Sequence, residues 1–137
     1  MKRILAPILL LTLSFPALAF GETMDDLVQR PKWTGLYYKK FTEVPFTGKV
    51  TGKMQGTFRN GKEDGPWVYY WKNGQLFKKG TYKDDKRVGP WIKYHKNGQL
   101  WSKGTYKDGK KNSPWVSYHF NGQLLSKGTF KDGVKVK

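Results

Sequence analysis

Two segments of the sequence carry the spacing of a phosphate-binding loop. Gly56–Lys62 reads GTFRNGK and Gly104–Lys110 reads GTYKDGK, so each matches the first seven positions of the P-loop motif. In that motif the eighth residue is Ser or Thr, which binds Mg²⁺, and a helix follows to receive the phosphate. Here the eighth residues are Glu63 and Lys111, and no helical pattern follows. We therefore expect no nucleotide site, and the glycine spacing has another origin.

The two histidines, His95 and His119, are the candidates for metal binding. They occupy equivalent places in neighbouring copies of a repeat, where Trp71 stands in the copy before them. Equivalent places on adjacent hairpins are two strand spacings, or about 10 Å, apart. One ion cannot bridge that distance without a carboxylate or Cys between the rings, and the chain has no Cys. We expect no metal, no cofactor and no thiol chemistry.

The acidic residues that recur in the sequence are those that begin turns. Asp84, Asp108 and Asp132 stand where Asp is favoured for local hydrogen bonding. No pair of carboxylates recurs on one face at the spacing of a glycosidase, and no Ser lies in a nucleophile elbow. The sequence therefore predicts a protein that is not an enzyme and has no small-molecule substrate.

These spacings share one source, a unit of 24 residues that occurs three times without a gap. The copies are Gly56–Lys79, Gly80–Lys103 and Gly104–Lys127, and a fourth copy begins at Gly128. A fixed period of this size indicates supersecondary units that stack on their neighbours. We predict an all-β fold in which antiparallel hairpins, two strands per unit, form an elongated, curved, single-layer meander sheet.

Each unit contains two turn signals between alternating apolar runs. An Asn-Gly pair favours a two-residue type I′ hairpin turn, and we expect one in every copy. The pairs are Asn73 and Gly74, Asn97 and Gly98, and Asn121 and Gly122. We expect a second, longer turn at Asn60-Gly61 and at its counterparts in the following units.

The two-residue turn fixes a register in which a bulky residue meets a glycine. Counting back from the turn places Trp67 opposite Gly80, and the later units repeat this pair. We expect the indole to lie over the one residue of the partner strand that has no side chain. Residues identical in every copy serve this packing: Trp67, Trp91 and Trp115, Gly80, Gly104 and Gly128, and Tyr70, Tyr94 and Tyr118.

The repeated pattern G-T-[YF]-K-[DN]-G-K-x-x-G-P-W-x-x-Y-x-x-N-G-Q-L resembles the bacterial variant of the MORN (membrane occupation and recognition nexus) repeat, a family that includes YwqK-family antitoxins. The resemblance covers Gly56 to Lys137. The sequence departs from the pattern at Asp85, where Gly is usual, and at Asn112-Ser113 before Pro114. The resemblance implies an elongated curved sheet used for binding or scaffolding, with no chemistry of its own.

The first 19 residues have the pattern of a secretory signal. Lys2-Arg3 begins it, Ile4–Phe15 is apolar, and Ala17-Leu18-Ala19 is a small-x-small cleavage site. We expect an exported protein, periplasmic or secreted, that begins at Phe20. Removing Lys2 and Arg3 leaves 24 of the 26 basic residues against 10 acidic ones, a net charge of about +14.

The segments before the repeats have no repeat pattern. We expect residues 20–32 to be a flexible leader or a short helix capped by Thr23. Residues 33–55 are expected to form a degenerate hairpin, with strands over Leu36–Lys40 and Phe46–Thr51, that caps the first true repeat.

Positions that vary between the copies are freer to serve a partner than those that do not. They form ladders along the predicted sheet that mix aromatic and basic side chains, with a row of lysines beside them. Such a surface suits a long anionic or amphipathic partner, although a solvated basic face explains the same charges. The predicted partner-binding residues are Tyr69, Trp71, Phe77, Lys93, His95, Trp101, His119, Lys79, Lys103 and Lys127.

Three functions remain open at this point. The first is a non-enzymatic, exported binding or scaffold module that engages a protein partner or an anionic envelope surface. The second, which follows the resemblance, is an antitoxin-like protein that neutralises a toxin by direct binding. The third is binding of single-stranded nucleic acid, which the pI of 10.0 suggests. Beyond the signal only Arg30, Arg59 and Arg87 are arginines, which disfavours recognition of bases and phosphates.

Overall fold

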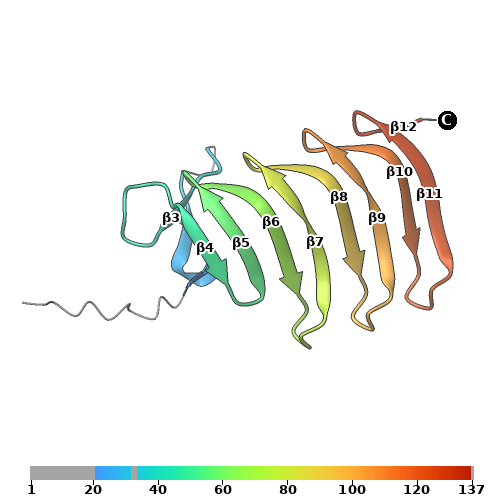
Figure 1. Cartoon of the computed structure of the whole chain (residues 1–137), viewed down its shortest axis with the longest axis horizontal. Coiled ribbons are helices and arrows are strands. Elements are labelled where there is room, and N and C mark those ends of the chain that lie inside the picture. Colours follow the sequence, from blue (N-terminus) through green and yellow to red (C-terminus); the bar gives the residue numbers. More distant parts are fainter. Residues whose placement is uncertain (1–20, 32–33, 137) are drawn as a thin grey trace, which may run out of the picture.

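The computed structural model of this chain describes residues 21–31 and 34–136. The predicted signal sequence, Met1–Ala19, lies outside the described residues, as do Phe20 and residues 32–33. The described chain is an elongated array of antiparallel hairpins in one long sheet, with a second small sheet at the N-terminal end (Figure 1). The predicted all-β fold is therefore confirmed. None of its helical segments in these ranges is long and apolar enough to cross a bilayer.

The long sheet has ten strands, and from β4 onward each strand pairs with the next one in the sequence. The strands are β4 (Gly48–Thr51), β5 (Met54–Arg59), β6 (Lys62–Tyr70), β7 (Leu76–Lys83), β8 (Lys86–Tyr94), β9 (Leu100–Lys107), β10 (Lys110–Tyr118), β11 (Leu124–Lys131) and β12 (Val134–Val136). A two-residue strand, β1 (Glu22–Thr23), pairs in parallel with β4 at the sheet edge. Each repeat therefore contributes two paired strands, such as β6 and β7.

The two kinds of turn are the reverse of the prediction. Asn60 and Gly61 have φ values of 50° and 78°, and Arg59 pairs with Lys62, which makes this the two-residue type I′ turn. At Asn73-Gly74 only the glycine has a positive φ, and the Trp71 amide donates to the Gln75 carbonyl. This is a three-residue loop, a type I turn followed by a left-handed glycine.

The asparagine of the longer loop does not supply the predicted positive φ but forms side-chain hydrogen bonds. The Asn73 side chain accepts a hydrogen bond from the Gln75 amide (3.0 Å) and donates one to the Lys96 carbonyl of the next unit (3.0 Å). The extra loop residue displaces the pairing locally, so Tyr70 lies opposite Leu76 instead of Phe77. The bulge ends there, because Tyr69 and Lys78 pair as predicted.

At the two departures from the repeat pattern, the backbone has the same conformation as at the equivalent glycines of other units. Asp85 has a φ of 65° in its type I′ turn, where Gly61 has 78°. Ser113 has a φ of 71° before Pro114, where Gly89 has 66°. Residues with a Cβ are strained in this region, so the tertiary structure imposes these conformations on both.

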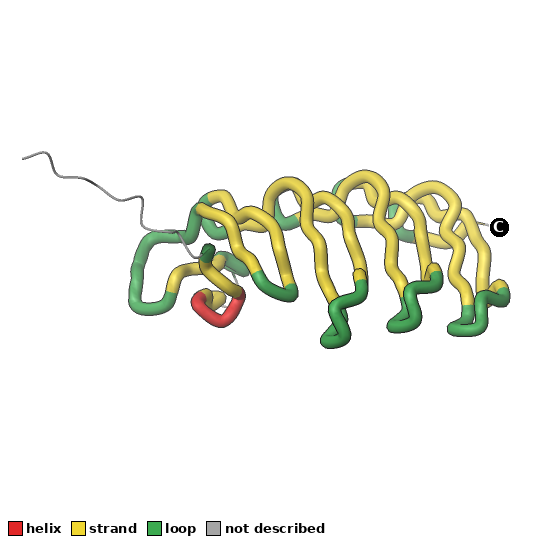
Figure 2. Tube along the Cα trace, turned by 60° about the horizontal axis from the view of Figure 1, so that its bottom comes forward, coloured by secondary structure: helices red, strands yellow, loops and turns green. Residues whose placement is uncertain are grey.

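Each long strand bends at the residue before its proline. In β6 this residue is Gly65 (φ 82°), and the pairing with β5 is interrupted at the same place, between Gln55 and Thr57. The strands arch as a result (Figure 2), and the hydroxyls of Tyr69 and Tyr82 come within 3.4 Å of each other.

Alternation along the strands gives the long sheet two distinct faces. We call the inner side of the arch the tryptophan face, defined by Trp67, Trp91 and Trp115. The other side, the lysine face, is defined by Lys79, Lys103 and Lys127. Val68 follows Trp67 and therefore points to the lysine face, where it lies directly opposite Lys79.

The predicted register of tryptophan and glycine is confirmed, but the predicted contact is wrong. Trp67 and Gly80 are opposite partners across the hairpin. However, a Cβ on Gly80 would collide with the ring of Trp91, from the strand on its other side. In the same way Trp67 covers Gly56 and Trp115 covers Gly104. Each indole therefore joins its own hairpin to the preceding hairpin, because the interrupted pairing leaves room for the ring.

The predicted capping hairpin over residues 33–55 does not form. The strand β3 (Tyr37–Lys39) pairs with β2 (Leu27–Gln29) in a separate two-stranded sheet, and β4 pairs with β5 in the long sheet. A single bridge, between Tyr38 and Pro45, lies where the hairpin was expected. Both predicted strands thus have a different partner.

The expected leader, residues 20–32, contributes β1, a 3-10 turn η1 (Met24–Asp26) and β2 to this end of the protein. Thr23 precedes this turn, and its amide and hydroxyl both donate to the Asp26 carboxylate. The two-stranded sheet covers the tryptophan face of the first unit: Leu27 is buried with Phe58 and Trp67, and the Tyr37 ring packs against Phe58 at a 45° tilt, with ring centres 4.8 Å apart.

Candidate binding surfaces

The structure divides the predicted partner-binding residues between the two faces. The aromatic members lie on the tryptophan face, where Trp71 contacts Phe77 (4.1 Å between ring centres) and His95 stacks on Trp101 (5.2 Å). Phe77 and Trp101 continue this row at 6.3 Å. Lys79, Lys103 and Lys127 lie on the opposite face, so the predicted single surface of aromatic rings fringed by these lysines does not exist.

Two of the variable aromatic positions bind the next unit. The Trp71 indole N–H donates to the Tyr94 carbonyl (3.1 Å), and the His95 ring Nε2 lies 2.9 Å from the Tyr118 carbonyl. Trp and His thus present a ring nitrogen at the same place, which explains why the residue varies while the contact is kept. His119, in the last full unit, is exposed. At this position the variation between copies is compatible with one conserved contact between units.

A polar cluster lies inside the arch of the first unit, and sequence analysis did not identify it. The Glu63 carboxyl is partly buried and lies 3.5 Å from the Tyr69 hydroxyl. Burial and the neighbouring Asp85 raise the pKa of Glu63 to about 7. Burial also raises the pKa of Tyr69 and lowers the pKa of Lys78, whose ammonium lies 4.0 Å from the centre of the Tyr69 ring. The cluster is small and enclosed, which suits a structural role.

The equivalents of Glu63 in the next two units are basic and pack on aromatic rings. Arg87 lies 5.0 Å from the Trp91 ring centre, and its guanidinium donates to the Tyr106 hydroxyl. Lys111 lies 4.7 Å from the Trp115 ring centre. The charge at this position therefore changes sign along the array, from the N-terminal unit to the following ones.

The lysine face carries a regular row in which aliphatic and basic side chains alternate. Successive members are direct opposite partners in adjacent strands, so all of them point the same way. In chain order across the sheet the row reads Val68, Lys79, Ile92, Lys103, Val116 and Lys127. Its three lysines are exposed, and its three aliphatic residues are half-buried.

Two further rows flank this one on the lysine face. On one side prolines lie opposite threonines, as Pro90 does with Thr105, and on the other side tyrosines lie opposite leucines, as Tyr94 does with Leu100. The prolines are exposed, whereas the tyrosines are half-buried. A single layer leaves all of this surface uncovered by any residue that the structure describes.

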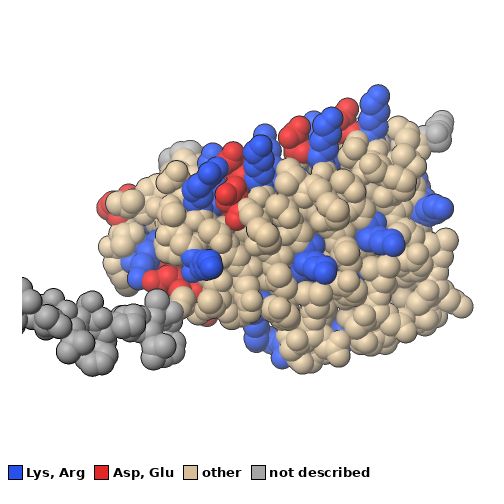
Figure 3. Space-filling model, viewed as in Figure 1, with Lys and Arg blue, Asp and Glu red and all other residues tan. Residues whose placement is uncertain are grey.

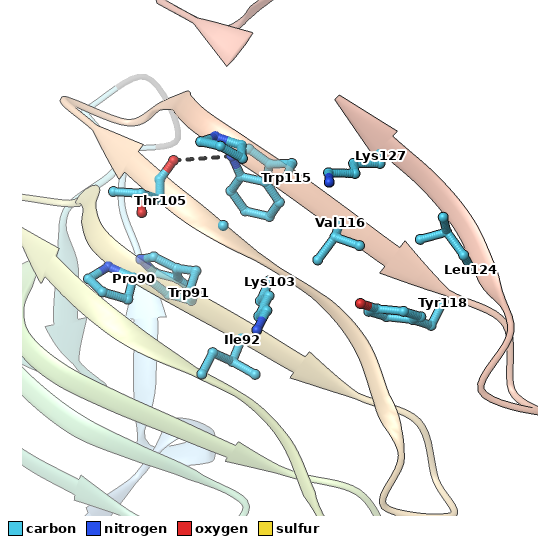
Figure 4. A pocket seen from close by; sticks show the side chains of 12 residues that line it. Pro90, Trp91, Ile92, Lys103, Thr105, Trp115, Val116, Tyr118, Leu124 and Lys127 are labelled. Atoms are coloured by element: carbon cyan, nitrogen blue, oxygen red, sulfur yellow. Dashed lines mark hydrogen bonds between the residues drawn. The ribbon is translucent and has the colours of Figure 1, made fainter. Parts of the chain in front are cut away.

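An open groove of about 560 Å³ lies on the lysine face between the second and third units. Figure 4 shows four of its side chains following one another across the strands. They are Ile92, Lys103, Val116 and Lys127. Pro114, Tyr118 and Leu124 complete a mainly apolar lining. The groove can receive an aliphatic or aromatic group, with two ammonium groups at its border.

The charges of the protein are spread unevenly. Figure 3 shows Lys and Arg side chains at intervals over uncharged surface, whereas Asp and Glu gather along one edge and near the N-terminal end. The formal net charge of the whole chain is +16. A surface of this kind attracts anionic partners at low ionic strength.

Comparison with known families gives one match. Residues 63–84, 87–108 and 111–132 each match the MORN repeat variant. Each matched segment holds one bent strand, its hairpin partner and the start of the type I′ turn. A search of curated proteins finds no match to this chain.

Proposed function

On the premise that three consecutive units match the MORN repeat variant, we propose that the protein is a non-enzymatic binding module that docks on an anionic envelope surface through its lysine face. Repeats of this family are often involved in protein or membrane binding and are generally not catalytic. The three units of this chain form one long sheet that can serve such a role.

The row of alternating aliphatic and lysine side chains is the observation that carries this proposal. Lys79, Lys103 and Lys127 are two strand spacings apart, which places them about 10 Å from one another along the sheet. The ammonium groups pair with lipid phosphates while the aliphatic side chains between them contact the upper acyl region. An apolar surface that the rest of the protein leaves uncovered is typical of an interaction site.

The proposed site of action is outside the cytoplasm, in the periplasm or beyond it. The support is the N-terminal pattern of Met1–Ala19. Sequencing the N-terminus of protein recovered from an envelope or culture fraction should give Phe20 as the first residue. Recovery of the uncleaved chain from the cytoplasm would contradict this part of the proposal.

Co-sedimentation with vesicles tests the docking surface directly. The triple variant Lys79→Gln, Lys103→Gln, Lys127→Gln should bind vesicles containing 30 per cent phosphatidylglycerol roughly 100-fold less tightly, at about 1 kcal/mol per lysine near an anionic surface. The matched control replaces exposed lysines at the turn edge, Lys62, Lys86 and Lys110, by Gln, with the same change of net charge. Equal losses in both variants would show that overall charge, not the lysine face, governs binding.

A second candidate function is an antitoxin-like protein that covers an acidic partner protein. The groove beside Ile92 and Val116 favours it, because a defined apolar hollow suits a side chain of a protein better than it suits a fluid lipid surface. Affinity purification from an envelope fraction, with Val116→Glu as the variant that fills the groove with charge, separates the two. Loss of a captured protein with unchanged vesicle binding would favour the antitoxin-like function.

A further inference from the structure

A row of residues beside the tryptophans changes in size and charge along the inner side of the arch. Its members are direct opposite partners in adjacent strands, so all of them point to the tryptophan face. From β5 to β11 the row reads Met54, Tyr69, Lys78, Lys93, Ser102, Ser117 and Ser126. The first unit therefore fills the inside of its arch with bulky side chains, whereas the third unit places small hydroxyl groups there.

The small side chains leave a polar groove in the second and third units, which we call the trough. It has a volume of about 240 Å³, and its lining includes Lys93, Ser102, Tyr106, Lys111 and Ser117. These five residues lie on β8, β9 and β10, each of which has a paired strand on both sides. The trough is thus a feature of the interior of the sheet and results from the size of its side chains.

The trough is positively charged, and its charge is not neutralised within the described ranges 21–31 and 34–136. No ion pair there includes Lys93 or Lys111. The Lys111 ammonium lies 4.7 Å from the Trp115 ring centre, and the Lys93 ammonium lies 5.5 Å from the Trp101 ring centre. In the first unit the counterpart of Lys111 is the acidic Glu63. The attraction for an anion therefore increases along the arch from the first unit to the third.

Hydroxyl groups inside the trough can donate hydrogen bonds to such an anion. The Oγ atoms of Ser117 and Ser126 are 2.6 Å apart, so one hydroxyl donates to the other and the proton of the second is free for a ligand. The Tyr106 hydroxyl accepts a hydrogen bond from the Arg87 guanidinium (3.1 Å), which leaves its own proton free as well. Ser102 lies directly opposite Ser117 and adds a third hydroxyl.

We propose that the trough binds the phosphate group of a small, soluble phosphate monoester. Such a group carries nearly two negative charges at neutral pH and three strong acceptor oxygens, which match two ammonium groups and several hydroxyl donors. A carboxylate has one charge and two oxygens, so it would leave part of this donor set unused. The trough lies on the inner side of the arch, where a flat lipid surface has less access than a small soluble ester.

This site is independent of the proposed membrane docking. The trough lies on the tryptophan face, whereas vesicle docking uses Lys79, Lys103 and Lys127 on the opposite face. Failure of one proposal therefore leaves the other standing, and both can be tested on the same protein.

Isothermal titration calorimetry of the full chain with glucose 6-phosphate, at pH 7.5 and low ionic strength, tests the site. We expect a dissociation constant below about 1 mM, competition by inorganic phosphate, and no binding of glucose. Absence of binding for both phosphate compounds overturns the proposal. Vesicles containing 30 per cent phosphatidylglycerol should not displace the ester, and displacement by them would reassign the trough to a lipid headgroup and overturn the soluble ligand.

The first unit supplies the substitutions that should remove the site. Lys111→Glu introduces the residue type of Glu63, and Ser117→Tyr introduces that of Tyr69. Each should weaken binding of glucose 6-phosphate at least about 10-fold, the first by reversing a charge and the second by filling the trough. The matched control is Lys110→Glu, which makes the same change of charge at an exposed neighbour and should alter the affinity less than about 2-fold.

Lys111→Gln keeps the test decisive if the bulkier or charge-reversed variants do not fold. It removes only the ammonium group, so circular dichroism and the thermal midpoint should match those of the parent while the affinity for glucose 6-phosphate falls at least about 3-fold. Parent-like affinity in folded Lys111→Gln overturns the proposal. Equal losses in Lys111→Glu and Lys110→Glu would do the same, because overall charge would then explain the binding.

Discussion

The two ends of the array are made of the same repeat, and they differ in what covers them. At the N-terminal end Phe58 and Trp67 are 0% and 1% exposed, whereas Trp115 in the third unit is 9% exposed and Leu124 beyond it is 57% exposed. The residue types change little between units, so the difference lies in the neighbours. A repeat of this kind buries its core only as far as the adjacent unit allows.

The N-terminal end is sealed by residues that do not belong to the repeat. Leu27 of the small sheet is 7% exposed and Val50 of β4 is 2% exposed, both in one cluster with Phe58 and Trp67. At the other end, the described chain offers only the three residues of β12 and the side chain of Lys135. The N-terminal end is thus built like a domain core, whereas the described residues at the other end leave Leu124 and Leu125 exposed.

The comparison predicts that equivalent tryptophans differ in their contribution to stability. Trp67→Ala should lower the free energy of unfolding by about 5 kcal/mol, because the ring is fully enclosed, and Trp115→Ala by about 3 kcal/mol. Urea denaturation followed by circular dichroism measures both. Equal losses would mean that the neighbouring unit does not decide burial energy.

The glycines at the equivalent position of successive units should also differ in how much stability is lost when they are replaced by Ala. Gly104→Ala forces its Cβ into the Trp115 ring and should cost about 2–3 kcal/mol, whereas Gly128→Ala should change stability by less than about 0.5 kcal/mol. Thermal melts of the two variants give this comparison. A large loss in Gly128→Ala would show that the open end is packed as tightly as the interior.

The sealed end should also make stability depend on pH through Glu63. Its pKa is about 7 in the folded protein against an ordinary 4.5, so the folded state holds a proton that the unfolded state has released between these values. The free energy of unfolding therefore falls as the pH rises from 4.5 through 7. Glu63→Gln should match the parent protein at pH 4 and exceed it by about 2 kcal/mol at pH 8.

Urea denaturation at both pH values checks this prediction. The matched control is Asp108→Asn, which removes one exposed carboxylate at a turn in the second half of the array and leaves the Glu63 cluster intact. If Glu63→Gln were no more stable than the parent at pH 8, the Glu63 carboxyl would be exposed to solvent in the folded protein, which would contradict its burial inside the arch of the first unit.

The smallest effect concerns the bend of the third unit. Ser113 has a φ of 71° where the first two units have Gly65 and Gly89. Ser113→Gly relieves this strain and should raise the free energy of unfolding by about 1 kcal/mol. Ser126→Gly, in a regular strand, should lower it by a similar amount. A loss of stability in Ser113→Gly would show that the serine side chain contributes more than its backbone strain costs.

The sequence alone determined the repeat, the strands and their register from Trp67 to Tyr69. These follow from a fixed period, alternating side chains and turn signals, all of which act within one hairpin. The arrangement of two distinct faces also follows from alternation. The predicted partner-binding residues, by contrast, come from both faces. Repetition shows which residues vary, but it does not show which face a side chain points to beyond a bulge in its strand.

Only the tertiary structure decided how one unit meets the next. The ring-nitrogen contacts of Trp71 and His95 cross unit boundaries, and each indole lies over a glycine of the preceding hairpin. The small sheet that seals one end likewise joins Leu27 to Phe58, far apart in the sequence. Such contacts depend on which surfaces are left to bury once the hairpins exist, and no local pattern encodes that choice.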